Sequence, residues 1–195
     1  SPLVKAAATQ DYGADVVLHG SVYDDAYARA QEIQQSTKGS VYVHAYEDPE
    51  IIMGQATMGL EIHQQLLDQG ISDPKIQVVI PIGGGGLFSG VAAALRQLRP
   101  GAKFFGVVSH AAPSFAESFK QGKVTQSSSP RSRTIAEGLA VKKVSELTFN
   151  IIKQLAEDIV VVDDGEVAGA ITNLMERGKL IVEGVNRVYK HMKRS

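Results

Sequence analysis

The sequence has no cysteine among its 195 residues. Disulfide bonds, thiolate catalysis and cysteine-based zinc sites are therefore excluded for this chain. Its five histidines also lack the close spacing that metal ligands show, so we expect no metal site built on them. The chemistry of the chain has to be sought in another pattern.

An excess of charge of one sign is also lacking. The net charge is -1, and the 20 lysines and arginines are spread along the chain, which gives no footprint for nucleic acid or an anionic membrane. No apolar run is long enough to span a bilayer, and no signal peptide opens the chain. We therefore expect a soluble, cytoplasmic protein that binds neither nucleic acid nor membranes.

Apolar runs and amphipathic stretches alternate along the chain, and this pattern predicts alternating strands and helices. Strands are expected at 14–20, 40–46, 76–82, 103–110 and 159–164, and helices at 2–12, 23–36, 49–67, 87–98, 113–120 and 145–158. The central strands are continuous apolar runs, as in parallel sheets that are covered on both sides. We therefore predict an α/β fold in which a mostly parallel sheet has helices on both faces.

Four consecutive glycines in the stretch PIGGGGLFSG (81–90) separate an expected strand from an expected helix. Open α/β sheets bind ligands at such strand ends. Glycine permits positive φ and exposes backbone N–H groups, and a helix N-terminus attracts anions. A tight turn with nothing bound needs fewer glycines, each of which costs roughly 0.5–1 kcal/mol relative to alanine. We therefore favour an anion site, with phosphate as its occupant, over an empty turn.

The flanking residues narrow the kind of phosphate. A Walker A loop needs Lys and then Ser or Thr after its last glycine, but Val91 follows Gly90. A dinucleotide site needs an acidic residue at the end of the next strand, where Ser109 and His110 stand instead. A small monophosphate cofactor is therefore favoured over a nucleotide, and an NAD(P) oxidoreductase stays a minor alternative. His110 itself is more typical of a solvated loop than of a catalytic site.

The glycine stretch resembles the tetraglycine loop that holds the phosphate of pyridoxal 5′-phosphate (PLP) in fold type II, tryptophan-synthase-β-like enzymes. More narrowly, the chain resembles the threonine dehydratase and serine racemase family. The further stretches that carry this resemblance are SPLVKAAATQDYGADVVLHG (1–20), YEDPEIIMGQATMGLEI (46–62), TIAEGLAVKKVSELTFNIIKQLAEDIVVVDDGEV (134–167) and ERGKLIVEG (176–184). They follow one another in the family's order.

The resemblance implies a PLP-dependent ammonia-lyase (dehydratase) that converts L-threonine or L-serine into a 2-oxo acid and ammonia. A serine racemase-like enzyme and a non-catalytic remnant that binds PLP or another phosphate stay open as alternatives. The cofactor-binding residues that the resemblance implies are Gly83, Gly84, Gly85, Gly86 and Leu87 at the phosphate, Gly138 flat against the pyridine ring, and Glu183 near that ring. From the residues alone, Gly138 is also explained as a turn and its neighbour Glu137 as a surface charge.

The chain departs from the family in its catalytic motifs. The Ser-Phe-Lys-type motif, whose lysine forms the Schiff base with PLP, does not occur, so we expect no catalytic residue within this sequence. Val108 and Ser114 stand where several relatives have an acidic ligand for a divalent cation. Asp163 with Glu166 is better explained as a helix capping box than as a catalytic pair, and Asp48 before Pro49 is likewise explained as a helix cap.

The two ends of the sequence also differ from the family pattern. The chain opens on Ser1 without an initiator methionine, and its last stretch, VNRVYKHMKRS (185–195), leaves the family pattern, so we expect truncation at both ends. Residues 1–45 are expected to be a remnant of the small domain, and 46–195 an incomplete large domain that binds the phosphate. Such truncation exposes apolar surface. We therefore expect a homo-oligomer or pairing with a full-length relative.

Overall fold

The computed structural model describes residues 3–20, 23–125, 134–141 and 143–182. The chain divides into two compact units, Ser1–Val43 and His44–Ser195. The assignment of residues 1–45 and 46–195 to a small and a large domain stays a prediction.

The first unit contains two helices, α1 (Leu3–Asp11) and α2 (Tyr23–Ser36), where the sequence predicts them. The strands expected at 14–20 and 40–46 are wrong, because neither segment has strand structure. A strand needs a neighbour to pair with its backbone N–H and C=O groups. Within the described residues these two apolar segments have no neighbouring strand, so their β-branched residues do not suffice to make a sheet.

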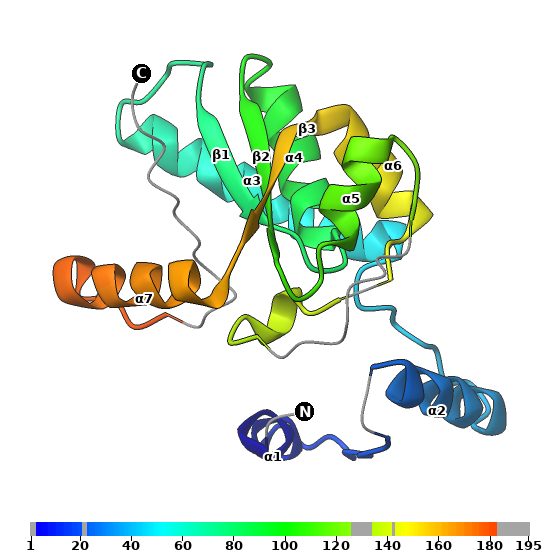
Figure 1. The fold of residues 1–195 in the computed structure, drawn as a ribbon. Coiled ribbons are helices and arrows are strands. Elements are labelled where there is room, and N and C mark those ends of the chain that lie inside the picture. The colour runs from blue at the N-terminus through cyan, green and yellow to red at the C-terminus, as the bar shows by residue number, and fades with distance from the viewer. Residues whose placement is uncertain (1–2, 21–22, 126–133, 142, 183–195) are drawn as a thin grey trace. The chain divides into compact units, whose positions relative to one another are not determined.

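Three parallel strands form the sheet of the second unit, in the order β1–β2–β3 (Figure 1). The strands are β1 (Gln77–Pro81), β2 (Lys103–Ser109) and β3 (Ala156–Val162). Because they run in the same direction, their carboxyl ends lie at one edge of the sheet, and helices form the connections. The predicted α/β fold with a mostly parallel sheet is confirmed.

The helices of the second unit alternate with its strands. They are α3 (Pro49–Asp68) before β1, α4 (Gly86–Leu98) between β1 and β2, α5 (Ser114–Gln121) and α6 (Glu146–Leu155) between β2 and β3, and α7 (Asp164–Gly178) after β3. A short 3₁₀ helix spans Glu137–Leu139. In the described part of the chain, no helix combines the length and the apolar character needed to cross a membrane.

Both expected helix caps are present. Asp48 precedes α3 and accepts a hydrogen bond from the Glu50 N–H at 2.7 Å, with Pro49 as the first helical residue. Asp163 and Glu166 form a reciprocal capping box at the start of α7, with bonds of 2.8 and 3.1 Å. These carboxylates therefore satisfy N–H groups that a helix start leaves unpaired.

Helices pack against both faces of the sheet, as predicted. The larger cluster joins strand residues such as Phe104 and Val108 to α4, α5 and α6, and Figure 1 shows α3 and α4 behind the sheet. Side chains of neighbouring strand residues point to opposite faces, so Val107 belongs to the other cluster. There it packs with Val162 and with Val167 of α7.

The contact between α3 and α4 is unusually close because two glycines lie in it. A Cβ atom on Gly90 would lie 2.4 Å from the Ile52 carbonyl oxygen, and one on Gly59 would lie 2.9 Å from the Val91 carbonyl oxygen. Gly90 thus allows the backbones of α3 and α4 to approach closely, although it lies in the same glycine-rich stretch of sequence as the turn.

Arg99 joins the end of α4 to the segment that follows α3. Its side chain is buried, and its guanidinium donates to the carbonyl oxygens of Ile71 and Asp73, both at 2.7 Å. Its Nε donates to His63 Nδ1 at 3.2 Å. The planar fork of an arginine suits three acceptors at once, so the burial of this charge is compensated.

Candidate functional site

The tetraglycine stretch forms the turn between β1 and α4, at the carboxyl edge of the sheet. Ile82, directly before the glycines, still donates to the Val107 carbonyl at 2.7 Å, so strand pairing continues up to the turn. Gly85 is the N-cap of α4 and has φ of 91°, a left-handed conformation that favours glycine. The turn therefore leads from a buried strand directly into a helix N-terminus.

Close packing is a second reason for glycine in this turn, beside access for a ligand. Three of the four glycines approach other parts of the chain so closely that a side chain would not fit. An added Cβ atom would lie 2.5 Å from the Gly138 carbonyl oxygen at Gly83, 2.1 Å from the Tyr46 ring at Gly84, and 2.8 Å from Thr148 at Gly85.

The N-terminus of α4 is suited to an anion. Gly85 makes no side-chain cap hydrogen bond, because it has no side chain. The N–H groups of a first helical turn lack intrahelical acceptors and carry partial positive charge. In that turn the Ser89 hydroxyl is fully buried and has no hydrogen-bond partner among the described residues. A glycine cradle with an uncapped helix start and an unsatisfied hydroxyl fits a phosphate group.

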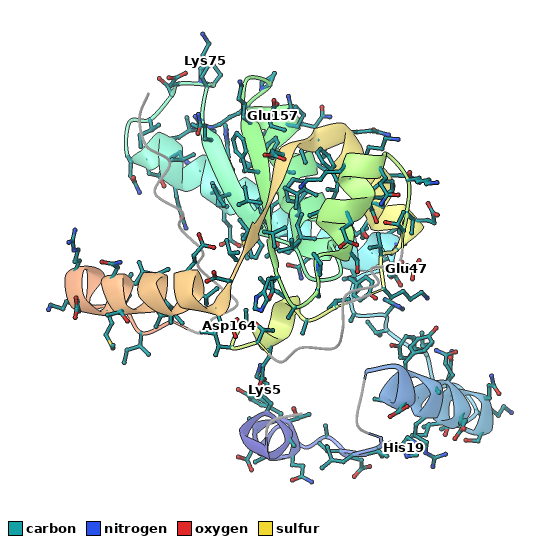
Figure 2. The ribbon with its side chains drawn as sticks, viewed as in Figure 1. Lys5, His19, Glu47, Lys75, Glu157 and Asp164 are labelled. Carbon is teal, nitrogen blue, oxygen red and sulfur yellow. The ribbon has the colours of Figure 1, made fainter. Side chains whose placement is uncertain are left out.

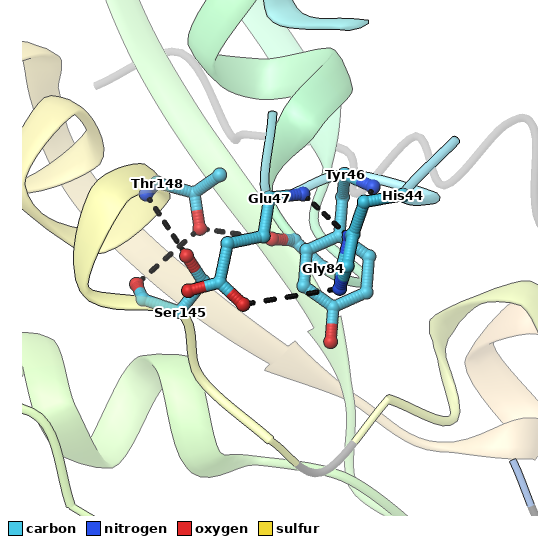
Figure 3. A network of polar contacts seen from close by, with 6 residues as sticks. All are labelled: His44, Tyr46, Glu47, Gly84, Ser145 and Thr148. Carbon is cyan, nitrogen blue, oxygen red and sulfur yellow. Dashed lines mark hydrogen bonds and ion pairs between the residues drawn. The ribbon is translucent and has the colours of Figure 1, made fainter. Parts of the chain in front are cut away.

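The first turn of α6 supports the glycine turn from one side (Figure 3). Ser145 is the N-cap of α6, and its Oγ accepts from the Thr148 N–H at 3.5 Å. The Thr148 hydroxyl donates to the Gly84 carbonyl oxygen at 2.9 Å. Thr148 is fully buried and Gly84 is half-buried, so this hydrogen bond is partly shielded from water.

The segment before α3 lies on the glycine turn through the ring of Tyr46, which is 7% exposed. His44 shapes this segment: its Nδ1 accepts from the N–H groups of Tyr46 at 3.2 Å and Glu47 at 2.8 Å (Figure 3). An accepting Nδ1 places the proton of the neutral imidazole on Nε2, which lies 3.8 Å from Glu47 Oε2. The His44 and Tyr46 rings meet edge to face at 4.8 Å.

The segment that carries Gly138 is held by a second polar network. The Thr134 hydroxyl donates to Asp164 Oδ1 at 2.5 Å, and the Ile135 N–H donates to Asp164 Oδ2 at 3.2 Å. Ser109, at the end of β2, donates to the Thr134 hydroxyl oxygen at 3.2 Å. The end of β2 and the start of α7 thus hold the start of the segment whose Gly138 carbonyl lies against Gly83.

Both networks lie at the same edge of the sheet. Figure 2 shows Glu47 and Asp164 at the edge where the strands end, and Lys75 and Glu157 at the opposite edge. No group of three or more histidine, aspartate or glutamate side chains in the described ranges could hold a metal ion. The polar groups of the two networks make hydrogen bonds to the backbone, as from Thr148 to Gly84, and to other side chains, as from Thr134 to Asp164.

The structure brings most of the residues implied by the resemblance together. The four glycines and Leu87 form the turn and the start of α4, and the Gly138 carbonyl reaches Gly83. Glu137 and His110 are exposed, and Glu183 lies outside the described residues. The cofactor roles of these residues stay predictions.

Three residues at the turn were missed by the sequence reasoning: Tyr46, Ser89 and Thr148. The Ser145-x-x-Thr148 spacing is typical of a helix start and could have placed the beginning of α6. Nothing local in the sequence links that helix start to Gly84, which lies 64 residues earlier.

Comparison with known proteins identifies the family. A family model described as pyridoxal-phosphate dependent enzyme matches residues 1–186. An L-threonine ammonia-lyase of Geobacter sulfurreducens is 44% identical over 188 residues, which is 96% of this chain and 44% of the relative. A catabolic L-threonine dehydratase of Escherichia coli is 38% identical over 94% of this chain and 53% of its own length.

Solved structures agree with these sequence matches. The processed form of threonine deaminase isoform 2 from Solanum lycopersicum has a TM-score of 0.83 and 34% identity, over 95% of this chain and 48% of that one. Maize serine racemase also has a TM-score of 0.83, with 29% identity over 93% of this chain and 54% of that one. The chain thus spans about half the length of the relatives it matches. The match of the family model over residues 1–186 shows that this chain belongs to the family of pyridoxal-phosphate dependent enzymes.

Proposed function

We propose that this chain provides the phosphate-binding part of a PLP-dependent ammonia-lyase that converts L-threonine or L-serine into a 2-oxo acid and ammonia. The observation that carries this proposal is the glycine turn at the uncapped N-terminus of α4. It occurs in a chain that is 44% identical to an L-threonine ammonia-lyase.

In this proposal the backbone N–H groups of the glycine turn and Leu87 bind the phosphate of PLP. Bound PLP supplies an electron sink for negative charge on the amino acid's α-carbon. The chain's contribution is to bind and orient: the turn holds the phosphate, and Gly138 offers a flat surface beside it without a side chain. The role of Glu183 near the ring rests on the family resemblance alone.

We propose further that the lysine that binds PLP covalently is not among these 195 residues, because the family's lysine motif does not occur in them. Two alternatives follow from the relatives and from this gap. One is racemisation of serine, which is supported by the likeness to maize serine racemase. The other is a remnant that binds PLP or another phosphate without turnover.

The deciding experiment is an absorption titration of this chain with PLP, before and after borohydride, together with a threonine deamination assay. We expect reversible PLP binding, no borohydride-trapped adduct and no turnover by these residues alone. A trapped adduct with turnover would contradict the proposed absence of the lysine. Tight binding of NAD(P)H without binding of PLP would overturn the family-based function.

The same assay at the protein's natural length separates the two reactions. Release of ammonia and 2-oxobutanoate from L-threonine supports the lyase, whereas formation of D-serine from L-serine without ammonia supports the racemase. The homo-oligomeric state and the cytoplasmic location stay predictions, which sedimentation and cell fractionation would test.

A further inference from the structure

The Thr148 hydroxyl joins two parts of the chain that are 64 residues apart, α6 and the glycine turn. It has a single proton to donate and two carbonyl oxygens within reach, that of Gly84 at 2.9 Å and that of Ser145 at 3.4 Å. The shorter distance assigns the proton to Gly84. The position of Thr148 is itself fixed by burial and by its place in the first turn of α6.

This hydrogen bond determines where the next N–H group points. In a trans peptide the C=O of one residue and the N–H of the next point in opposite directions, and the described chain has no cis peptide. Because the Gly84 carbonyl faces Thr148, the Gly85 N–H faces away from α6. A peptide between two glycines has little steric preference of its own, so the opposite orientation would also be accessible without this bond.

The other contacts of the turn do not replace the hydroxyl. The Tyr46 ring limits the space beside Gly84, and Ile152 limits the space beside Gly85, but both contacts are steric. Among the described residues, the Thr148 hydroxyl is the only donor of a hydrogen bond to the Gly84 carbonyl oxygen. A steric contact restricts position, whereas a hydrogen bond selects the direction of the peptide dipole.

We propose that Thr148 is a positioning residue that orients the peptide between Gly84 and Gly85, so that the Gly85 N–H faces the phosphate. This inference rests on the proposed function of the turn. Thr148 acts through the peptide, and its hydroxyl fixes the direction of the N–H group before the phosphate binds. Preorganisation of this kind strengthens binding because the ligand does not have to reorder the loop.

The test compares Thr148→Val, which keeps the shape and removes the hydroxyl, with Thr148→Ser, which keeps the hydroxyl. Ile159→Val, in the core of β3, serves as a control for a general loss of stability. Three quantities are measured on the protein at its natural length: the dissociation constant of PLP, the ³¹P chemical shift of bound PLP, and amide hydrogen exchange of residues 83–88 without ligand.

We expect Thr148→Val to weaken PLP binding about ten-fold, as for one lost hydrogen bond, and to shift the ³¹P signal. It should also speed up exchange of the buried residues Gly85, Gly86 and Phe88 in the ligand-free protein, because a less ordered turn admits water to their amides. Thr148→Ser should restore all three quantities most of the way, and Ile159→Val should leave them near wild type.

Unchanged PLP affinity, ³¹P shift and exchange in Thr148→Val would overturn the inference, as would a Thr148→Ser variant that behaves like Thr148→Val. If the wild-type protein does not bind PLP, the proposed function of the turn fails and the cofactor part of the inference fails with it. Hydrogen exchange then still decides whether Thr148 fixes the peptide. The two failures are therefore distinguishable.

Discussion

At the scale of single residues, three of the four glycines of the turn are required by a close neighbour or by their backbone conformation. Gly83 lies against a backbone carbonyl, Gly84 against an aromatic ring, and Gly85 has positive φ. These constraints act within the protein itself, before any ligand binds. An alanine in the turn is therefore expected to affect stability as well as cofactor binding.

We expect Gly84→Ala to lower the free energy of unfolding by about 1–3 kcal/mol, the usual cost of overpacking. The new methyl group would lie 2.1 Å from the Tyr46 ring, which has to move. Urea unfolding followed by circular dichroism measures the change. Gly169→Ala on α7 is the matched control: apart from the helix's own backbone, no atom of the described residues lies within 4 Å of the added Cβ, so equal or higher stability is expected. Equal losses in both variants would refute the steric explanation.

Residue roles were predictable from the sequence where the interaction is local. The capping box of Asp163 and Glu166 was predicted correctly because both partners lie within one helical turn. The contact between Thr148 and Gly84 was not predicted, because it depends on how α6 packs against α4 and the turn before it. Hydrogen-bond partners that only the tertiary fold brings together leave no local pattern.

At the scale of elements, the position of the glycine turn depends on the crossing of α3 and α4. Gly59 and Gly90 let the two helix backbones approach, and Arg99 ties the far end of α4 to the segment after α3. Helix α4, whose N-terminus belongs to the proposed anion site, is therefore held by packing near its start and by hydrogen bonds at its end.

We expect Gly90→Ala to destabilise the fold by about 1–3 kcal/mol, because the added methyl group would meet backbone atoms of α3 at 2.4 Å. Gly54→Ala on α3 should instead be neutral or stabilise by up to about 1 kcal/mol, since its added Cβ would have no described atom within 4 Å outside the helix's own backbone. Thermal unfolding of both variants checks the contrast. A more stable Gly90→Ala variant would show that the crossing is looser than described.

For Arg99→Lys we expect a loss of about 2–4 kcal/mol in the free energy of unfolding. An ammonium group cannot reach the carbonyls of Ile71 and Asp73 together with His63 in the planar geometry of the guanidinium. Denaturant titration at constant pH gives the value, and Arg29→Lys on exposed α2 provides a control that should change little. An Arg99→Lys variant as stable as its control would show that these three hydrogen bonds of Arg99 do not stabilise the fold.

Helices and strands were predicted well where the spacing of apolar residues agrees with glycine or proline residues at the ends of the element. The helix expected at 87–98 is α4 (Gly86–Leu98), and the strand expected at 76–82 is β1 (Gln77–Pro81). The strands expected at 14–20 and 40–46 failed because β-branched residues signal only a tendency. Whether such a segment pairs depends on neighbours that its own residues do not specify.

At the scale of the whole molecule, α3 carries exposed apolar side chains at a regular spacing. Met53, Leu60 and Leu67 follow one another every seven residues and are 63%, 52% and 43% exposed. Residues seven apart lie on the same face of a helix, so these side chains form an apolar stripe. An exposed stripe of this kind favours association.

We expect the protein to self-associate at micromolar concentration, and Leu60→Gln with Leu67→Gln to reduce that association. Removal of apolar surface from the stripe weakens the hydrophobic driving force in proportion to its area. Sedimentation velocity over a concentration series measures the effect, and Val79→Gln on the exposed side of β1 serves as a comparison. A wild-type protein that stays monomeric throughout would contradict this expectation.

The hydrogen bond from Thr148 to Gly84 also has a consequence for biosynthesis. The glycine turn emerges from the ribosome well before α6, yet the turn is held by a residue 64 positions later in the chain. Closing a loop of that length costs entropy, which is recovered only when α6 has docked. A nascent chain that ends after α4 therefore contains the four glycines but lacks the hydrogen bond from Thr148 that holds the turn. Binding of the cofactor at the proposed site should therefore begin, during translation, only after α6 has been made.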